Sequence, residues 1–154
     1  MDRLYFEDFP PGEIVEYGDT LVTAEAIVQF AREFDPQPFH LGEETARDSL
    51  AGELIASGWH TAAMLMRMTC DAFLIRAAGQ GSPGIESLDW VKPVRPGDRL
   101  RARRTTLSAR PSRSRPALGV VEFLFEALNQ NAEVVMTQKG AIFFRRRAAE
   151  ETAP

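Results

Sequence analysis

The most constraining feature of the sequence is the segment from Gly58 to Ala78, which contains no proline and no glycine after its first residue. Large apolar residues recur throughout it and fall on more than one face of a helix. Arg67, Asp71 and Arg76 are its only charged residues. At 1.5 Å per residue the segment predicts a helix of roughly 30 Å. A helix that is apolar nearly all round is buried by other structure, so we expect the rest of the chain to enclose it.

The part of the chain that follows is rich in β-forming residues. It divides into segments of about eleven residues each, at 85–94, 99–109, 117–128 and 133–144. Turn-forming residues separate these segments at 95–98, 111–116 and 129–131. We interpret all three connections as hairpin loops. Hairpins in succession predict an antiparallel sheet.

Two elements and an irregular segment precede the long helix. Residues 13–22 mix β-branched and aromatic residues and predict a strand. Thr23 is a good N-cap for a helix over 24–34, which must end before Pro36. Residues 43–56 are charged and weakly periodic. They predict a short overhang with one or two helical turns.

These elements predict an α+β domain in which a curved antiparallel sheet of about five strands wraps a long central helix. The 154 residues fit a single domain over 1–147, and we expect a disordered tail over 148–154. Strands of this length leave exposed edges, which are usually paired across a two-fold axis. We therefore expect a homodimer or a higher homo-oligomer.

Composition excludes several functions. The net charge of −4 and the lack of interleaved basic and aromatic residues argue against a nucleic-acid partner. No apolar run is long enough to span a bilayer, and the N-terminus lacks the features of a leader. Cys70 is the only cysteine, so an intrachain disulfide is impossible. We expect a cytoplasmic protein that binds neither membrane nor metal.

The most chemically suggestive residues are Asp35 and His40, five positions apart with Pro36 and Pro38 between them. The prolines predict a stiff, extended turn. Such a turn can hold a carboxylate and an imidazole toward one volume, as acid/base chemistry on a single water requires. The alternative is structural, because aspartate before proline is a common turn former and a lone histidine is often only a satisfied polar residue.

Gly58 opens the long helix, so its backbone N–H is one of the unpaired donors at the positive end of the helix dipole. A thioester carbonyl placed there would find an oxyanion hole. Ser57 is a natural N-cap, and we favour that role over a nucleophilic one. We interpret His60 as a packing or hydrogen-bonding residue. Two histidines without a matching ligand set do not predict a metal site.

The stretch Asp35-Pro-Gln-Pro-Phe-His40, followed by Ser57-Gly58 at the start of a helix, resembles the MaoC-type dehydratases of the hot-dog fold, which include (R)-specific enoyl-CoA hydratases. Their signature is D-x-N-P-x-H, then a short overhang, then H-G opening the central helix. The resemblance implies that Asp35 and His40 form the catalytic dyad and that the Gly58 amide is the oxyanion donor. The chain departs from the signature at Gln37, where asparagine is usual, and at Ser57, where histidine is usual. It also has Gly42 two residues after the motif histidine, where the family often has an acidic residue.

The activity implied by the resemblance is a hydro-lyase reaction, the reversible hydration of a 2-enoyl thioester such as an enoyl-CoA to a 3-hydroxyacyl thioester. No cofactor is expected, because coenzyme A is part of the substrate. The residues expected to contact this acyl thioester are Gln37, Phe39, Ser57 and Trp59, with Arg113 and Arg115 suited to its phosphates. The alternatives are a hot-dog thioesterase, whose base would have to be Asp71, and a non-catalytic subunit that binds acyl thioesters.

Overall fold

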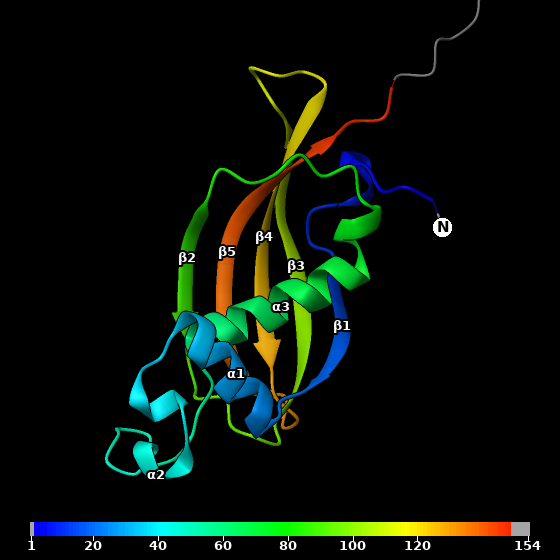
Figure 1. Cartoon of the computed structure of the whole chain (residues 1–154). Helices are drawn as coiled ribbons and strands as arrows, with labels where there is room; N and C mark the ends of the chain where they lie inside the picture. Colours follow the sequence, from blue (N-terminus) through cyan, green and yellow to red (C-terminus); the bar gives the residue numbers. More distant parts are fainter. Residues whose placement is uncertain (1, 149–154) are drawn as a thin grey trace, which may run out of the picture.

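The computed structural model describes residues 2–148 (Figure 1). In chain order its elements are η1 (Phe6–Asp8), β1 (Ile14–Leu21), α1 (Ala24–Phe34), η2 (Pro38–His40), α2 (Glu43–Ala46), α3 (Gly58–Ala72), η3 (Leu74–Arg76), β2 (Ile85–Trp90), β3 (Arg99–Pro111), β4 (Leu118–Leu128) and β5 (Val134–Arg145), where η marks a 3-10 helix. The strands form one antiparallel sheet in the order β1-β3-β4-β5-β2. This arrangement confirms the predicted α+β class.

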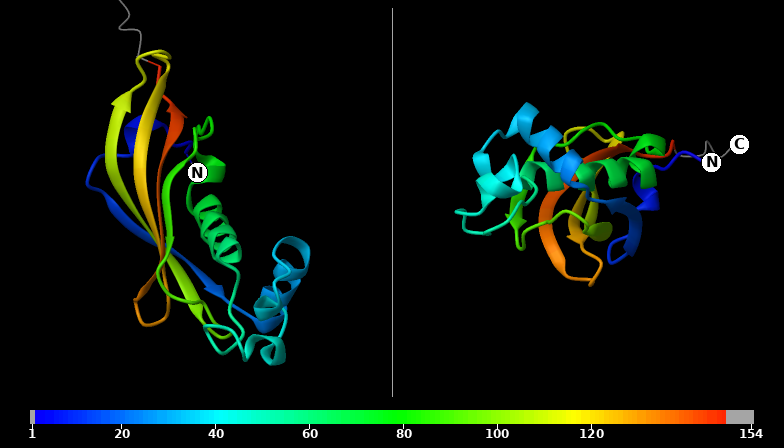
Figure 2. Two further views of the ribbon diagram at one scale, coloured as in Figure 1. Left: turned by 90° about the vertical axis from the view of Figure 1, so that its left-hand side faces the viewer. Right: turned by 60° about the horizontal axis from the view of Figure 1, so that its bottom comes forward.

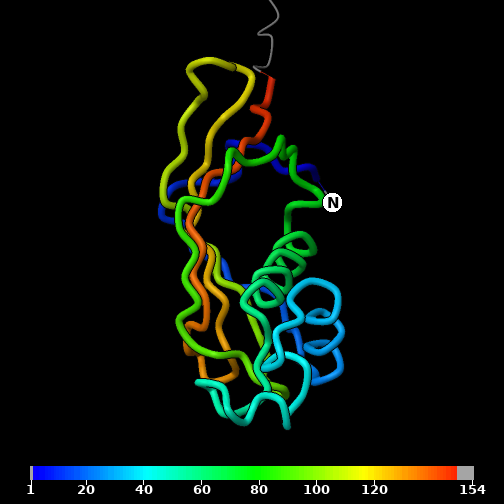
Figure 3. Tube along the Cα trace, turned by 60° about the vertical axis from the view of Figure 1, so that its left-hand side comes forward, coloured from blue at the N-terminus to red at the C-terminus, as the bar shows by residue number. Residues whose placement is uncertain are grey.

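Helix α3 lies across the inner face of the curved sheet (Figures 2 and 3). Burial alternates along β4, so that Phe123 and Phe125 face the helix while intervening residues are partly exposed. Leu65 and Met68 of α3 pack with them in the same core cluster. Phe9, from the segment before β1, packs edge-on against Phe123 in this core, with ring centroids 5.6 Å apart. The buried apolar residues of the described chain therefore form one core, between the helix and the sheet.

Helix α1 and the short helix α2 sit at one end of the domain, beside the start of α3 (Figures 1 and 2). The Thr23 side chain accepts a hydrogen bond from the Ala26 N–H at 3.1 Å and caps α1 as predicted. The helix ends at Phe34, before the proline turn. Helix α2 is a single turn within the predicted overhang. Among residues 2–148, no helix has both the length and the apolar character needed to cross a membrane.

The predicted hairpin at 95–98 is wrong. Strand β2 pairs with β5 and lies at the opposite edge of the sheet from β1, so the chain crosses the sheet before β3 begins. Strand β3 pairs with β1 on one side and with β4 on the other. Backbone hydrogen bonds attach the crossing segment to other parts of the chain. The Ala56 N–H, before α3, donates to the Val94 carbonyl at 2.8 Å, and the Gly97 N–H donates to the carbonyl of Val22, just after β1, at 2.7 Å.

Helix α3 is also shorter than predicted and only partly enclosed. It stops at Ala72 because Phe73 leaves the helical region, with φ −154°, and packs its ring near those of Phe9 and Phe123. Met66 of α3 keeps 47% of its surface exposed. One chain therefore does not bury this helix completely. Of the predicted tail, residue 148 lies in no helix or strand, and residues 149–154 lie outside the described part of the chain.

Candidate active site

Asp35 and His40 lie on the short connection between α1 and α2. Asp35 is the C-cap of α1, and its backbone N–H donates to the Ala31 carbonyl at 2.9 Å. Pro38 opens the single turn η2, whose last residue is His40. The turn brings His40 Nε2 to 3.5 Å from Asp35 Oδ2. The two side chains thus lie next to each other.

The imidazole of His40 is held in a defined orientation. Its Nδ1 lies 2.7 Å from the Ile55 carbonyl oxygen, and the residue is only 4% exposed. A carbonyl oxygen can only accept, so Nδ1 carries the proton of this hydrogen bond. In the neutral ring, Nε2 is then left with a lone pair directed toward Asp35. This is the tautomer that a general base on the Asp35 side requires.

The carboxylate of Asp35 accepts two side-chain hydrogen bonds. Ser57 Oγ donates to Oδ2 at 2.6 Å, and Gln37 Nε2 donates to Oδ1 at 2.7 Å. The hydrogen bond from Ser57, then that from Gln37, and then the nearby His40 together hold the pKa of Asp35 below its ordinary value, although burial opposes them. Asp35 is therefore ionised at neutral pH.

A cavity of about 260 Å³ opens where α3 begins. Its walls come from His40, from Gly58 and Thr61 in the first turn of α3, and from residues 90–94, which begin at the last residue of β2. The Gly58 N–H is among the first donors of α3, at the positive end of its dipole. Any side chain at position 58 would overlap the indole ring of Trp90, which explains why a glycine stands there.

An apolar cavity of about 470 Å³ adjoins this one. The two share Ile55 and Pro93 as wall residues. Phe39 lines the second cavity, together with residues 49–51 of the overhang. An elongated molecule whose polar end lay beside Gly58 would find apolar surface for the rest of its length here.

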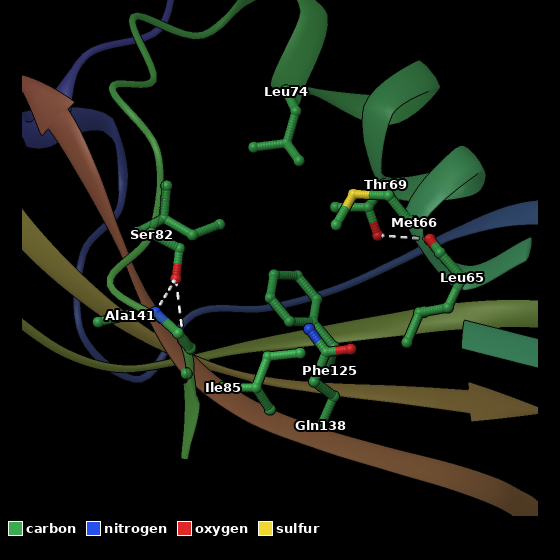
Figure 4. Close-up of a pocket in the computed structure, with 12 residues that line it drawn as sticks. Leu65, Met66, Thr69, Leu74, Ser82, Ile85, Phe125, Gln138 and Ala141 are labelled. Atoms are coloured by element: carbon green, nitrogen blue, oxygen red, sulfur yellow. Dashed lines mark hydrogen bonds between the residues drawn. The ribbon is translucent and has the colours of Figure 1, made fainter. Parts of the chain in front are cut away.

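A third cavity lies apart from these two, between α3 and the strands β2, β4 and β5 (Figure 4). It measures about 240 Å³ and is almost wholly apolar, with Leu65, Met66, Ile85 and Phe125 among its walls. It shares no wall residue with the cavity that holds His40 and Gly58. The acid/base pair therefore does not act in this cavity.

The other predicted site residues occupy different positions. Ser57 is fully buried behind Asp35 and lines none of the cavities described above. Trp59 is more than half exposed and packs edge-on against Trp90, with ring centroids 5.1 Å apart. Arg113 and Arg115 lie at the tip of the β3–β4 hairpin, which projects from the end of the sheet far from α2 (Figure 1). One chain does not bring these arginines to its own His40 cavity.

His60 belongs to the packing of α3 on α1. Its ring stacks on that of Phe30, with centroids 4.7 Å apart and planes 11° apart. Its Nδ1 is buried without a hydrogen-bond partner, and burial lowers the pKa of the ring. These contacts agree with a packing role.

Sequence reasoning missed two residues of the site, Trp90 and Ile55. Trp90 closes the cavity over Gly58, and the Ile55 carbonyl orients His40. The sequence pattern places Trp90 only in a strand, and its contact with Gly58 depends on the unexpected crossing of the sheet. The role of the Ile55 carbonyl cannot be predicted from the residue type, because every residue has a backbone carbonyl. The glycine at a helix start is the one signal that something large approaches closely there.

The model of the family described as "MaoC like domain" matches residues 8–121. Among solved structures, a MaoC-like dehydratase from Rhodospirillum rubrum is 44% identical, with a TM-score of 0.87; the match covers 95% of this chain and 99% of that one. The uncharacterized protein YdeM from Bacillus subtilis is 26% identical over 140 residues, which are 91% of this chain and 98% of YdeM.

The R-hydratase PhaJ1 from Pseudomonas aeruginosa is 20% identical, with a TM-score of 0.76, and the match covers 99% of this chain and 95% of PhaJ1. At this identity the likeness shows a shared fold, and with the Rhodospirillum structure it confirms the predicted hot-dog fold.

Proposed function

The chain belongs to the MaoC-like domain family, and from this membership we propose that it is a hydro-lyase that reversibly hydrates a 2-enoyl thioester to a 3-hydroxyacyl thioester. One observation carries the proposal: Asp35 Oδ2 and His40 Nε2 lie 3.5 Å apart, and His40 shares a cavity with the amide end of α3. A water-activating pair and an oxyanion donor are the two devices that this reaction needs.

In the proposed reaction, a water molecule within reach of Asp35 Oδ2 and His40 Nε2 loses a proton to Nε2. Its oxygen forms a bond to the β-carbon of the enoyl thioester. The electron pair of the carbon–carbon double bond moves toward the thioester carbonyl, whose oxygen is stabilised by the Gly58 N–H. The proton on Nε2 is then delivered to the α-carbon, so that one water is added in all. Dehydration follows the same steps in reverse.

The apolar cavity beside the site supports a substrate with a long arm, because it continues from Ile55 and Pro93 toward Phe39. A coenzyme A thioester has such an arm, and the Rhodospirillum dehydratase and the R-hydratase PhaJ1 are named for the same class of reaction. We keep coenzyme A as the proposed carrier.

A thioesterase activity is a weaker candidate. A hydrolase of this kind would need a base on the central helix, and Asp71 is the carboxylate there. Asp71 accepts a hydrogen bond from Arg67 Nε at 2.9 Å, and both side chains are exposed. Neither Asp71 nor its partner Arg67 lines any of the cavities described above, whereas His40, the partner of Asp35, lines the cavity at Gly58. This difference favours hydration over hydrolysis.

The test of the proposed function is to mix the wild-type chain with crotonyl-CoA and to follow the loss of enoyl absorbance and the release of free thiol in parallel. Hydration predicts that absorbance falls while no thiol appears. Thiol release without hydration would identify a thioesterase. Binding of crotonyl-CoA with no turnover, over a panel of enoyl chain lengths, would identify a non-catalytic subunit.

We also propose that the chain forms a homodimer through its β2–α3 face, defined by Trp59, Met66, Ile85, Trp90 and Val91. All five side chains are exposed in one chain, although they are apolar. Within residues 2–148, strand β2 is an edge strand that pairs with β5 alone, so its other edge could pair with a second copy.

Met66→Glu is expected to dissociate this dimer, because the substitution places an unpaired charge in an apolar interface. We expect the dissociation constant to rise by about 100-fold or more, which corresponds to roughly 3 kcal/mol. Size-exclusion chromatography with light scattering measures the change from the mass of two chains to that of one. Ile75→Glu is the matched control, since Ile75 is exposed on η3 at the other end of α3. A dimer unaffected by Met66→Glu would contradict the assignment of this face.

A further inference from the structure

The hydroxyl of Ser57 uses both of its hydrogen-bonding functions inside the protein. It donates to Asp35 Oδ2 at 2.6 Å and accepts from the Trp59 N–H at 3.3 Å. The second contact makes Ser57 the N-cap of α3. The residue is fully buried, so its hydroxyl does not reach a ligand in the cavity. Its short contact to Asp35 therefore needs an explanation other than substrate binding.

The oxygen of Asp35 that accepts from Ser57 is also the one that faces His40 Nε2. Gln37 holds the other oxygen, Oδ1. With a donor on each oxygen, the carboxylate cannot rotate freely about its Cβ–Cγ bond. Ser57 is joined by a peptide bond to Gly58, which supplies the proposed oxyanion donor. Ser57 therefore links this donor to the Asp35 carboxylate through its own side chain.

We propose that Ser57 is a positioning residue that fixes the Asp35 carboxylate relative to His40 and ties it to the amide end of α3. The proposal rests on the proposed function and extends it. A single hydroxyl would fix the position of the water-activating pair relative to the oxyanion donor. The signature that this chain resembles has a histidine where the chain has Ser57, so the proposed role of the hydroxyl is not one that the signature implies.

A consequence concerns the protonation of the dyad. The groups in contact with the Asp35 carboxylate are the Ser57 hydroxyl, the Gln37 amide and the His40 imidazole. Removing the Ser57 hydroxyl removes the largest influence that lowers the pKa of Asp35, so this pKa must rise. In wild type the carboxylate stays ionised to a lower pH than in the variant.

The kinetic test compares Ser57→Ala with wild type. We expect kcat for crotonyl-CoA hydration to fall about 10- to 100-fold with little change in KM, because a misplaced catalytic group costs rate more than binding. The acidic limb of the pH–rate profile should move to higher pH. Ser57→Thr, which keeps the hydroxyl, should restore most of the rate.

Two controls separate positioning from helix capping. Ser57→Gly keeps a residue that caps helices well but lacks the hydroxyl, so it should lose activity as Ser57→Ala does. Thr23→Ala removes the N-cap of α1, at the opposite end of that helix from Asp35. It should lower the melting temperature without changing the pH profile. If Ser57→Ala affected the rate no more than Thr23→Ala, the positioning role would be overturned.

A measurement that needs no turnover completes the test. The carboxyl carbon of Asp35, assigned with Asp35→Asn, is titrated by ¹³C NMR in wild type and in Ser57→Ala. A higher pKa in the variant supports the positioning role, even if the wild type hydrates nothing and the proposed function fails. Identical titrations in the two proteins would overturn the positioning role, even if the enzyme is active.

Discussion

Asp35→Asn and His40→Ala, each in a folded chain, are expected to lower kcat/KM for enoyl-thioester hydration by about 10²- to 10⁴-fold, the range typical of a lost acid/base group. Asp35→Asn keeps the size of the side chain and leaves it beside Gln37 and Ser57, but it removes the negative charge. His40→Ala removes Nε2, the base that faces Asp35 at 3.5 Å. The measurement is the initial rate of loss of enoyl absorbance for crotonyl-CoA, with circular dichroism to verify folding.

The matched control for the aspartate is Asp71→Asn, on the exposed side of α3. It removes a carboxylate that is paired with Arg67 and lies at no cavity described above, so the hydration rate should stay within about two-fold of wild type. Retention of full activity by Asp35→Asn or His40→Ala would exclude the dyad. Loss of activity in Asp71→Asn would instead favour chemistry based on the central helix.

The parts of this site that could be predicted from the sequence are those set by short-range geometry. Pro36 and Pro38 restrict the backbone between Asp35 and His40, and a glycine beginning a long helix marks an open amide end. Both features depend on residues close in the chain, and the structure contains both. The helix over 24–34 followed from the same kind of local evidence, a cap before it and a proline after it.

The contacts that complete the site could not be predicted, because they join residues far apart in the chain. The sequence identifies Ser57 as a helix cap, but its bond to Asp35 spans 22 positions. Trp90 reaches Gly58 only because β2 pairs with β5. A period-2 pattern says which side chains share a face of a strand, but it does not say which strand lies next to it. The false hairpin at 95–98 has the same origin.

A buried arginine in β3 also makes contacts with residues far apart in the chain that its strand pattern does not predict, and these contacts lead to a prediction about stability. Alternation along β3 places Leu100, Ala102 and Arg104 on the inner face. The guanidinium of Arg104 lies 5.2 Å from the ring centroid of Phe9 and 5.0 Å from that of Phe73. The pattern reveals that one arginine of this strand faces inward. It does not reveal the cation–π contacts or the partner that neutralises the charge.

That partner is Glu13, which forms an ion pair with Arg104 from the segment before β1. The Arg104 side chain is 6% exposed, and its Nε is buried without a partner. The guanidinium has therefore lost most of its hydration, and Glu13 is the negative charge that compensates it. This pair differs from those on the outer face of the sheet, such as Arg99 with Asp19, where both side chains are more than half exposed.

Glu13→Ala is expected to lower the free energy of unfolding by about 3 kcal/mol, because it leaves the Arg104 charge buried and unpaired. Chemical denaturation at neutral pH measures this loss. Asp19→Ala, which breaks the exposed pair with Arg99, is the control and should cost much less stability than Glu13→Ala, because both of its charged groups remain in contact with water. The double variant Glu13→Leu/Arg104→Met should regain most of the loss, since it replaces both charges with apolar groups of similar length. If Glu13→Ala cost no more than Asp19→Ala, water or another group would have to compensate the buried arginine, and Glu13 would not be its stabilising partner.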